Sequence, residues 1–115
     1  EGQVGSDGTF AIFAAPEFGI RAMARVLLNY QRLHGINTIA GIIERWAPGF
    51  ENKTAAYIAH VSQVLGISPE MPFNVETRLA ELIKVIIKHE NGQQPYSDEL
   101  IKLGLRMAEE PIVYA

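Results

Sequence analysis

The sequence predicts a mainly α-helical fold, an irregular orthogonal bundle of about five helices. Apolar residues recur every three or four positions in five separate segments, which is the spacing that gives a helix one buried face. Residues that cap or stop helices separate these segments, among them Gly35, Gly66 and the pair Asn91-Gly92. No heptad pattern lasts for several turns, so we expect crossing helices rather than a coiled coil.

The N-terminal part, residues 1–15, is predicted to be an arm that precedes the helices. Residues 9–14 (TFAIFA) are apolar and β-prone, so we expect a short strand or extended segment there. The helical body should span residues 16–110, and both parts together are predicted to form one domain, residues 1–115. Because the chain starts at Glu1 inside a Gly-rich stretch and without a methionine, we expect that an N-terminal segment is missing.

The first helix is predicted to begin at Pro16. Proline fits the first helical position because it has no N–H to leave unpaired, and Glu17 favours the positive end of the helix dipole. Gly35 should end this helix near His34. The residues expected to face inward are Ile20, Met23, Ala24, Leu27, Leu28 and Tyr30.

Two further helices are predicted between residues 37 and 66. Asn37 or Thr38 is suited to cap the second helix, and Pro48 should stop it. Asn52 is predicted to cap the third helix, and Gly66 to close it in a left-handed conformation. The inward residues are expected to be Ile39, Ile42, Ile43 and Trp46 in the second helix, and Ala55, Ile58, Ala59, Ser62 and Leu65 in the third.

The last two helices follow a connector, residues 67–73, that holds two prolines. Asn74 is predicted to cap a fourth helix that continues to about His89, and Ser97 to cap a fifth over residues 98–108. The sequence assigns no element after Pro111. The inward residues are expected to be Leu79, Leu82, Ile83 and Ile86, followed by Leu100, Ile101, Leu103, Leu105 and Met107.

Composition excludes several classes of function. The 115 residues carry a net charge of −3, which disfavours a nucleic-acid binder even though Arg21, Arg25 and Arg32 recur along the first helix. The absence of cysteine rules out disulfides, thiolate zinc sites and a cysteine nucleophile. No apolar run approaches the roughly 20 residues of a membrane span, so no membrane span is expected.

Motifs for metals and cofactors are also missing from the sequence. His34, His60 and His89 lack the spacing of a metal site such as HExxH, and no phosphate-binding loop occurs. We therefore predict neither a metal nor a cofactor.

The most distinctive segment, residues 46–57, places polar groups and aromatic rings around a helix start. Trp46 and Tyr57 are candidates to stack on a sugar face, and Asn52 and Thr54 to hydrogen-bond its hydroxyls. A structural interpretation competes with this one, because Asn52 would also serve as a cap, Glu51 would favour the helix dipole, and Trp46 would fit a core.

A second candidate segment, residues 89–96, joins the last two helices. It contains His89, Glu90, Asn91 and Tyr96, which are suited to bind a polar ligand. Adjacent residues of a helix point about 100° apart, so His89 and Glu90 do not form a catalytic dyad with each other. The structural alternative is that His89 simply stabilises the C-terminal end of a helix.

Paired carboxylates are the remaining sign of an enzyme, because glycoside cleavage needs an acid and a second group or a positioned water. Glu51 and Glu90 are weak catalytic candidates, whereas Glu44 follows an inward isoleucine and should face outward. Whether the protein is an enzyme at all stays open at this point.

Several of these runs resemble a family of small bacteriophage and prophage proteins, usually described as virion or structural proteins, and the resemblance covers nearly the whole chain. The runs that carry it are Phe10-Ala-Ile-Phe13, Pro16-Glu-Phe-Gly-Ile-Arg-Ala22, Trp46-Ala-Pro48, Glu51-Asn52-x-Thr54-x-x-Tyr57-Ile, and His89-Glu-Asn-Gly-Gln-Gln-Pro-Tyr96. Members of that family carry a segment reading like Gly-Ile-Arg-Asn-Asn-Asn-Pro-Gly-Asn-Ile-Arg before this point, and it is absent here.

The layout is also loosely similar to lysozyme-like peptidoglycan hydrolases and lytic transglycosylases. That similarity implies that Phe13 and Tyr57 line a glycan groove. Those enzymes place their catalytic glutamate ahead of the aromatic segment, where this sequence has only Glu1. The resemblance therefore leaves the catalytic residues unknown.

The resemblance implies a phage virion-associated protein, made in the cytoplasm of the bacterial host, that engages peptidoglycan and, as a lysozyme-like enzyme, cleaves its glycan strands. The alternative is a structural virion component without catalytic activity, whose partners are other virion proteins.

Overall fold

The computed structural model describes residues 16–48 and 51–109, and within those ranges the chain is helical with no β-strand. This confirms the predicted mainly α-helical fold, whereas the extended segment expected at residues 9–14 lies outside the described residues. None of the described helices is both long enough and apolar enough to cross a membrane. The elements are α1 (Pro16–His34), α2 (Ile39–Trp46), α3 (Glu51–Leu65), the 3₁₀ helix η1 (Val75–Arg78), α4 (Leu79–Asn91) and α5 (Asp98–Glu109).

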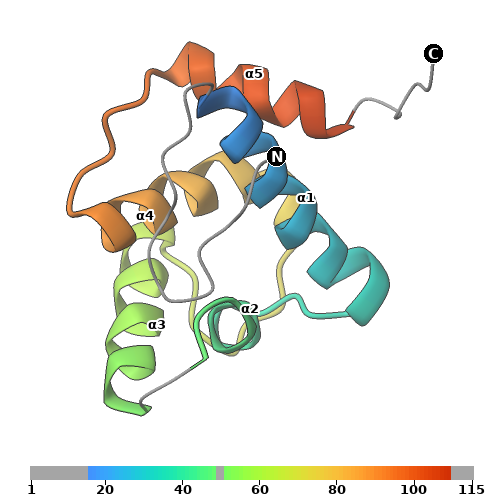
Figure 1. Ribbon diagram of the computed structural model, residues 1–115. Helices are drawn as coiled ribbons and strands as arrows, with labels where there is room; N and C mark the ends of the chain where they lie inside the picture. Colours follow the sequence, from blue (N-terminus) through green and yellow to red (C-terminus); the bar gives the residue numbers. More distant parts are fainter. Residues whose placement is uncertain (1–15, 49–50, 110–115) are drawn as a thin grey trace.

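The helix α4 connects the two ends of the bundle. It packs against α1 and α5 on one side and against α3 on the other, and α2 packs on α3. Figure 1 shows α1 and α5 lying together, with α2 and α3 at the opposite end of the molecule. The most extensive contact between two helices is that of α1 with α5.

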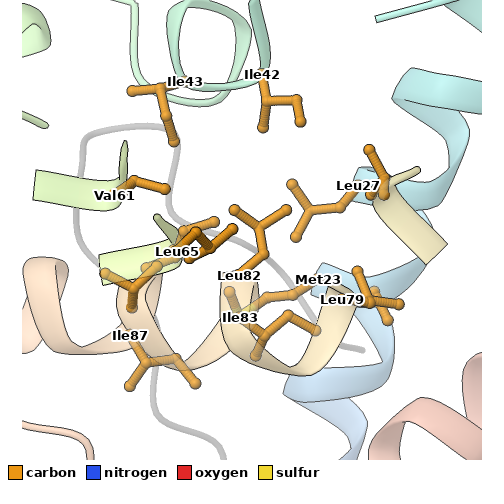
Figure 2. Packing of buried hydrophobic residues seen from close by; sticks show 14 of the residues in the cluster. Met23, Leu27, Ile42, Ile43, Val61, Leu65, Leu79, Leu82, Ile83 and Ile87 are labelled. Carbon is orange, nitrogen blue, oxygen red and sulfur yellow. The ribbon is translucent and has the colours of Figure 1, made fainter. Parts of the chain in front are cut away.

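A single apolar core lies where the helices meet. Figure 2 shows Ile42 and Ile43 of α2 facing Val61 of α3 and Leu82 of α4. Every side chain of this core is apolar or aromatic, and the described residues include no buried charged side chain. The largest fully buried side chains are Ile20, Met23, Leu27, Leu28, Ile39, Ile42, Ile43, Leu82, Ile83, Ile86, Ile87 and Ile101.

Local signals set most of the helix ends as predicted. The Thr38 hydroxyl accepts a hydrogen bond from the Gly41 backbone N–H at 3.1 Å, so Thr38 caps α2. Ser97 accepts from the Leu100 N–H at 3.1 Å at the start of α5. At the end of α4, Gly92 adopts a positive φ of 79°, a conformation that glycine enters without strain.

Two predicted caps are wrong. The helix α3 already begins at Glu51, so Asn52 lies in its first turn instead of preceding it. Asn74 does cap a helix, but that helix is η1: its side chain accepts from the Glu76 N–H at 3.0 Å, and α4 starts only at Leu79.

The buried face of α3 also differs from the prediction. Tyr57, Val61 and Leu65 are buried, four residues apart, whereas Ala55 and Ala59 are exposed. The helix carries apolar or small residues on most of its circumference, so periodicity alone does not select one face. Because this face of α3 is the buried one, Tyr57 lies toward α4.

The helices α1 and α5 approach each other at Gly104, a position that the sequence analysis did not single out. A Cβ atom added there would lie 2.7 Å from the Cβ atom of Ile20 and 3.2 Å from the Glu17 carbonyl oxygen. The Arg25 guanidinium adds a hydrogen bond to the Met107 carbonyl oxygen at 3.4 Å. The α1–α5 contact therefore depends on the absence of a side chain at one residue.

Candidate functional site

Four polar or aromatic side chains meet where α3 packs on α4. Tyr57 and His60 lie three residues apart on α3 and so share one face of that helix. His89 and Glu90 lie in the last turn of α4, just before its final residue, Asn91. We call these four residues, Tyr57, His60, His89 and Glu90, the α3–α4 cluster.

Tyr57 is the centre of this cluster. Its hydroxyl donates a hydrogen bond to Glu90 Oε2 at 2.9 Å, and its ring stacks on the His89 ring with centroids 3.7 Å apart and an angle of 19° between the planes. Only 5% of Tyr57 is exposed. One buried side chain thus touches both residues at the end of α4, although His89 and Glu90 point in different directions.

The environment of Tyr57 keeps its hydroxyl neutral. Burial raises the pKa of Tyr57 strongly, and the charge of Glu90 and the hydrogen bond to it raise the pKa further, while a side-chain hydrogen bond with Trp46 acts the other way. Tyr57 is consequently a permanent donor at physiological pH. The Glu90 oxygen it faces is an acceptor.

The two histidines of the cluster face each other through the same ring atom. His60 Nδ1 lies 2.9 Å from His89 Nδ1, and the rings are tilted by 39° with their centroids 5.1 Å apart. A hydrogen bond of this kind requires that one nitrogen carries the proton and the other accepts it. Burial, followed by the charge of His60, lowers the pKa of His89.

Neighbouring residues link the cluster to α2. The Thr54 hydroxyl donates to the Ala47 carbonyl oxygen at 3.3 Å, which ties the first turns of α3 to the end of α2. Trp46, the last residue of α2, is half-buried and packs against the core. These contacts place Trp46 and Thr54 on the Tyr57 side of α3.

The structure thus brings together parts of both segments that the sequence analysis selected. Trp46, Thr54 and Tyr57 come from the first segment, and His89 and Glu90 from the second. Tyr57 is buried in the core, which is where a side chain with a structural role lies. Its role in binding a glycan stays a prediction.

The other candidate residues either are not members of the cluster or lie outside the described residues. Asn91 is exposed, and Tyr96 is half-buried against the core, with its backbone N–H bound to Gln94 Oε1 at 2.6 Å. Phe13 lies outside the described residues. Glu51 and Asn52 belong to the first turn of α3, and their side chains are not among those described.

The carboxylates show different surroundings. Glu44 is exposed, as expected from its position after Ile43. Glu90 is half-buried and accepts the Tyr57 hydroxyl, an arrangement that fixes a carboxylate as an acceptor of hydrogen bonds. A general acid in glycoside cleavage must carry a proton itself, so this arrangement favours binding over proton donation.

Metal binding has little support in residues 16–48 and 51–109. That part of the chain holds no group of three or more His, Asp or Glu side chains placed to ligate one ion. His60 and His89 alone supply two nitrogens, whereas a zinc site takes three or four protein ligands.

The sequence analysis missed His60 as a member of this site. It considered His60 only as one of three histidines without metal-ligand spacing. The available signal was its spacing of three residues from Tyr57, which places both on one face of a helix.

Comparison with known proteins finds similarity to a bacteriophage protein. No family model matches the chain. Over 104 residues the chain is 43% identical to Protein P5 of Pseudoalteromonas phage PM2. The match covers 90% of this chain but 64% of Protein P5, so the chain spans somewhat less than two thirds of that relative. The chain therefore has a homologue among phage proteins.

Proposed function

Starting from this homology to a phage protein, we propose that the chain is a virion-associated protein that engages host peptidoglycan through the surface around the α3–α4 cluster. The observation that carries the proposal is the Tyr57–Glu90 hydrogen bond at 2.9 Å, which joins two sequence segments selected independently for polar binding. Polar side chains that are held in place by their neighbours are typical of sites that recognise hydroxyl and amide groups.

The burial of each residue determines the role that we propose for it in binding. Tyr57 is buried and positions the ring of His89 and the carboxylate of Glu90. Trp46 and Tyr96 are half-buried aromatics, which offer an edge or face to a sugar ring, and Asn91 is exposed with an amide for its hydroxyls. We propose binding as the primary activity, with cleavage of the glycan strand as a further step in which Glu90, an acceptor of the Tyr57 hydroxyl, would act as the base or nucleophile and not as the general acid.

Co-sedimentation with insoluble peptidoglycan tests the binding. The chain should pellet with peptidoglycan, and Asn91→Ala and Tyr96→Ala should each reduce the bound fraction several-fold. Lys102→Ala, a change of an exposed residue on α5, is the matched control and should bind normally. Absence of the unmodified chain from the pellet would refute the proposal.

Release of soluble sugar fragments from the same peptidoglycan tests cleavage separately. If Glu90 takes part in cleavage, Glu90→Gln should stop release and retain binding. Binding without any release by the unmodified chain would make the protein a wall-binding component without enzymatic activity.

A second candidate function is a structural role in the virion, through contacts with other virion proteins. It is favoured by the homology to a phage protein. Four large apolar side chains are highly exposed and available for such contacts: Phe18 at 42%, Val64 and Met71 at 56%, and Leu33 at 69%. Sedimentation velocity of the chain alone and cross-linking in purified virions test this role. A clean monomer that is absent from virions would exclude it.

A further inference from the structure

The contact of His60 with His89 has a property that no apolar contact between these helices shares: it depends on protonation. We propose that the histidine pair is an acid-sensitive latch that holds α3 against α4 when at most one of the two rings is charged and releases the end of α4 when both are charged. This inference concerns the fold itself and does not depend on the proposed binding of peptidoglycan.

The geometry of the pair sets the number of protons that it tolerates. With the two Nδ1 atoms 2.9 Å apart, only one proton fits between them. The neutral pair forms one hydrogen bond, and a singly charged pair keeps it, because a charged donor still faces a neutral acceptor. The doubly charged pair places two N–H groups head to head, which breaks the bond and adds repulsion between like charges.

The side chains that the structure places beside the pair are Tyr57 and, through Tyr57, Glu90 and Trp46. From α3, Tyr57 lies against the face of His89 and is neutral. From α4, the Glu90 carboxylate accepts the Tyr57 hydroxyl, and the causes that act on the pKa of His89 are burial and the charge of His60. From α2, Trp46 approaches Tyr57 and carries no charge.

The direction of the pH effect follows from the lowered pKa of His89. In the unfolded chain His89 takes up its proton near pH 6.5, but in the folded chain only at lower pH. The stability that the neutral ring contributes is therefore complete above pH 6.5 and is lost as the pH falls through the folded-state pKa. The two rings interact directly, so the protonation of His89 depends on the charge of His60.

Release of the latch would reach the candidate site through Tyr57. The Tyr57 ring stacks on His89, so a movement of His89 removes the stacking partner and changes the surroundings of Trp46. Trp46 is the only tryptophan of the chain, which makes its fluorescence a direct probe of this end of the molecule.

The test compares the pH dependence of unfolding by urea, followed by Trp46 fluorescence, in the unmodified chain and in His89→Asn. The asparagine side chain keeps a polar group near the position of Nδ1 but cannot be protonated. Between pH 7.5 and pH 5, the unfolding equilibrium constant should rise several-fold more in the unmodified chain than in this variant. His34→Asn, at an exposed histidine, is the control and should behave like the unmodified chain.

Imidazole NMR signals of the unmodified chain provide a second measurement that does not depend on any variant folding. The His89 signals should not follow a simple single-step titration, because the protonation of His89 depends on the charge of His60. A simple single-step titration of His89 would overturn the proposal. An identical pH dependence of unfolding in His89→Asn and the unmodified chain would overturn it as well.

Discussion

Different kinds of side chain make the helix–helix contacts at the two ends of this bundle. At one end, α1 and α5 meet through apolar side chains and a glycine, with Ile20 and Ile101 fully buried and Gly104 beneath Ile20. At the other end, α3 and α4 meet through a tyrosine, two histidines and a glutamate as well as through apolar residues. The first contact depends on shape, the second also on protonation.

Because of this difference, we expect the two ends to respond differently to a change of pH. Close packing of apolar groups changes little between pH 5 and pH 8, because none of the groups titrates there. Hydrogen bonds between titratable groups do change, and they lie at the end of the molecule to which the candidate binding residues belong. We therefore expect acid to loosen the α3–α4 end first and to leave the α1–α5 end closed.

The largest expected effect comes from the apolar end. Ile20→Ala should destabilise the protein by about 2–5 kcal/mol, because it removes a fully buried side chain and leaves a cavity between α1 and α5. The free energy of unfolding, measured with urea, checks this value. Leu33→Ala, a truncation of a highly exposed residue on the same helix, is the control and should cost little.

The same contact predicts an unusual sign for a change at Gly104. Alanine is normally the better residue inside a helix by about 0.5–1 kcal/mol, yet Gly104→Ala should destabilise by about 1–3 kcal/mol because its Cβ would collide with Ile20. Combining it with Ile20→Ala should recover only part of that cost, because alanine at position 20 removes the Cγ2 atom that the new Cβ would meet but keeps the Cβ atom at 2.7 Å. Additive effects of the two changes would contradict the steric explanation.

A smaller effect is expected at the polar end. Tyr57→Phe should destabilise by about 1–3 kcal/mol, because it removes a hydrogen bond to a half-buried carboxylate and leaves that carboxylate without this donor. In a Glu90→Gln background the same change should cost less, since the acceptor is no longer charged. Equal costs in both backgrounds would show that Tyr57 acts through packing alone.

A cap that belongs to neither of these two helix–helix contacts sets the scale for a single local hydrogen bond. Thr38→Ala should cost about 1 kcal/mol, because the Gly41 N–H loses its side-chain acceptor at the start of α2. Thr38→Ser, which keeps the hydroxyl, should restore most of the loss. An effect as large as that of Ile20→Ala would mean that α2 depends on this cap for more than its first turn.

The smallest effect is predicted for the exposed ion pair between Lys84 and Asp98, whose N and O atoms are 2.6 Å apart. Lys84 lowers the pKa of Asp98, so the small contribution of this pair is present above the ordinary aspartate range and is lost as the pH falls through the folded-state pKa. Asp98→Asn should lower the unfolding midpoint slightly at low salt and not at high salt. A loss that persists at high salt would contradict this view of the pair.

Much of the fold was predictable because its signals are local. Thr38, Ser97 and Gly92 act on backbone groups within a few residues, so a cap or a stop can be recognised from the sequence alone. The spacing of apolar residues in α1 and α4 predicted their buried faces for the same reason.

The remaining features depend on contacts between distant residues. The Tyr57–Glu90 hydrogen bond spans 33 positions, and the role of Gly104 depends on its packing beneath Ile20 of α1. Asn52 failed as a cap because α3 starts at Glu51. For the candidate site, the sequence indicated two segments but not that Tyr57 would join them or that His60 would face His89.

Amide hydrogen exchange at pH 7 and at pH 5 tests the contrast between the two ends most directly. After correction for the intrinsic pH dependence of exchange, we expect amides of α3 and of the C-terminal half of α4 to lose protection at pH 5. Amides of α1 and α5 should keep theirs. An equal loss of protection in all five helices, or a loss confined to α1 and α5, would contradict it.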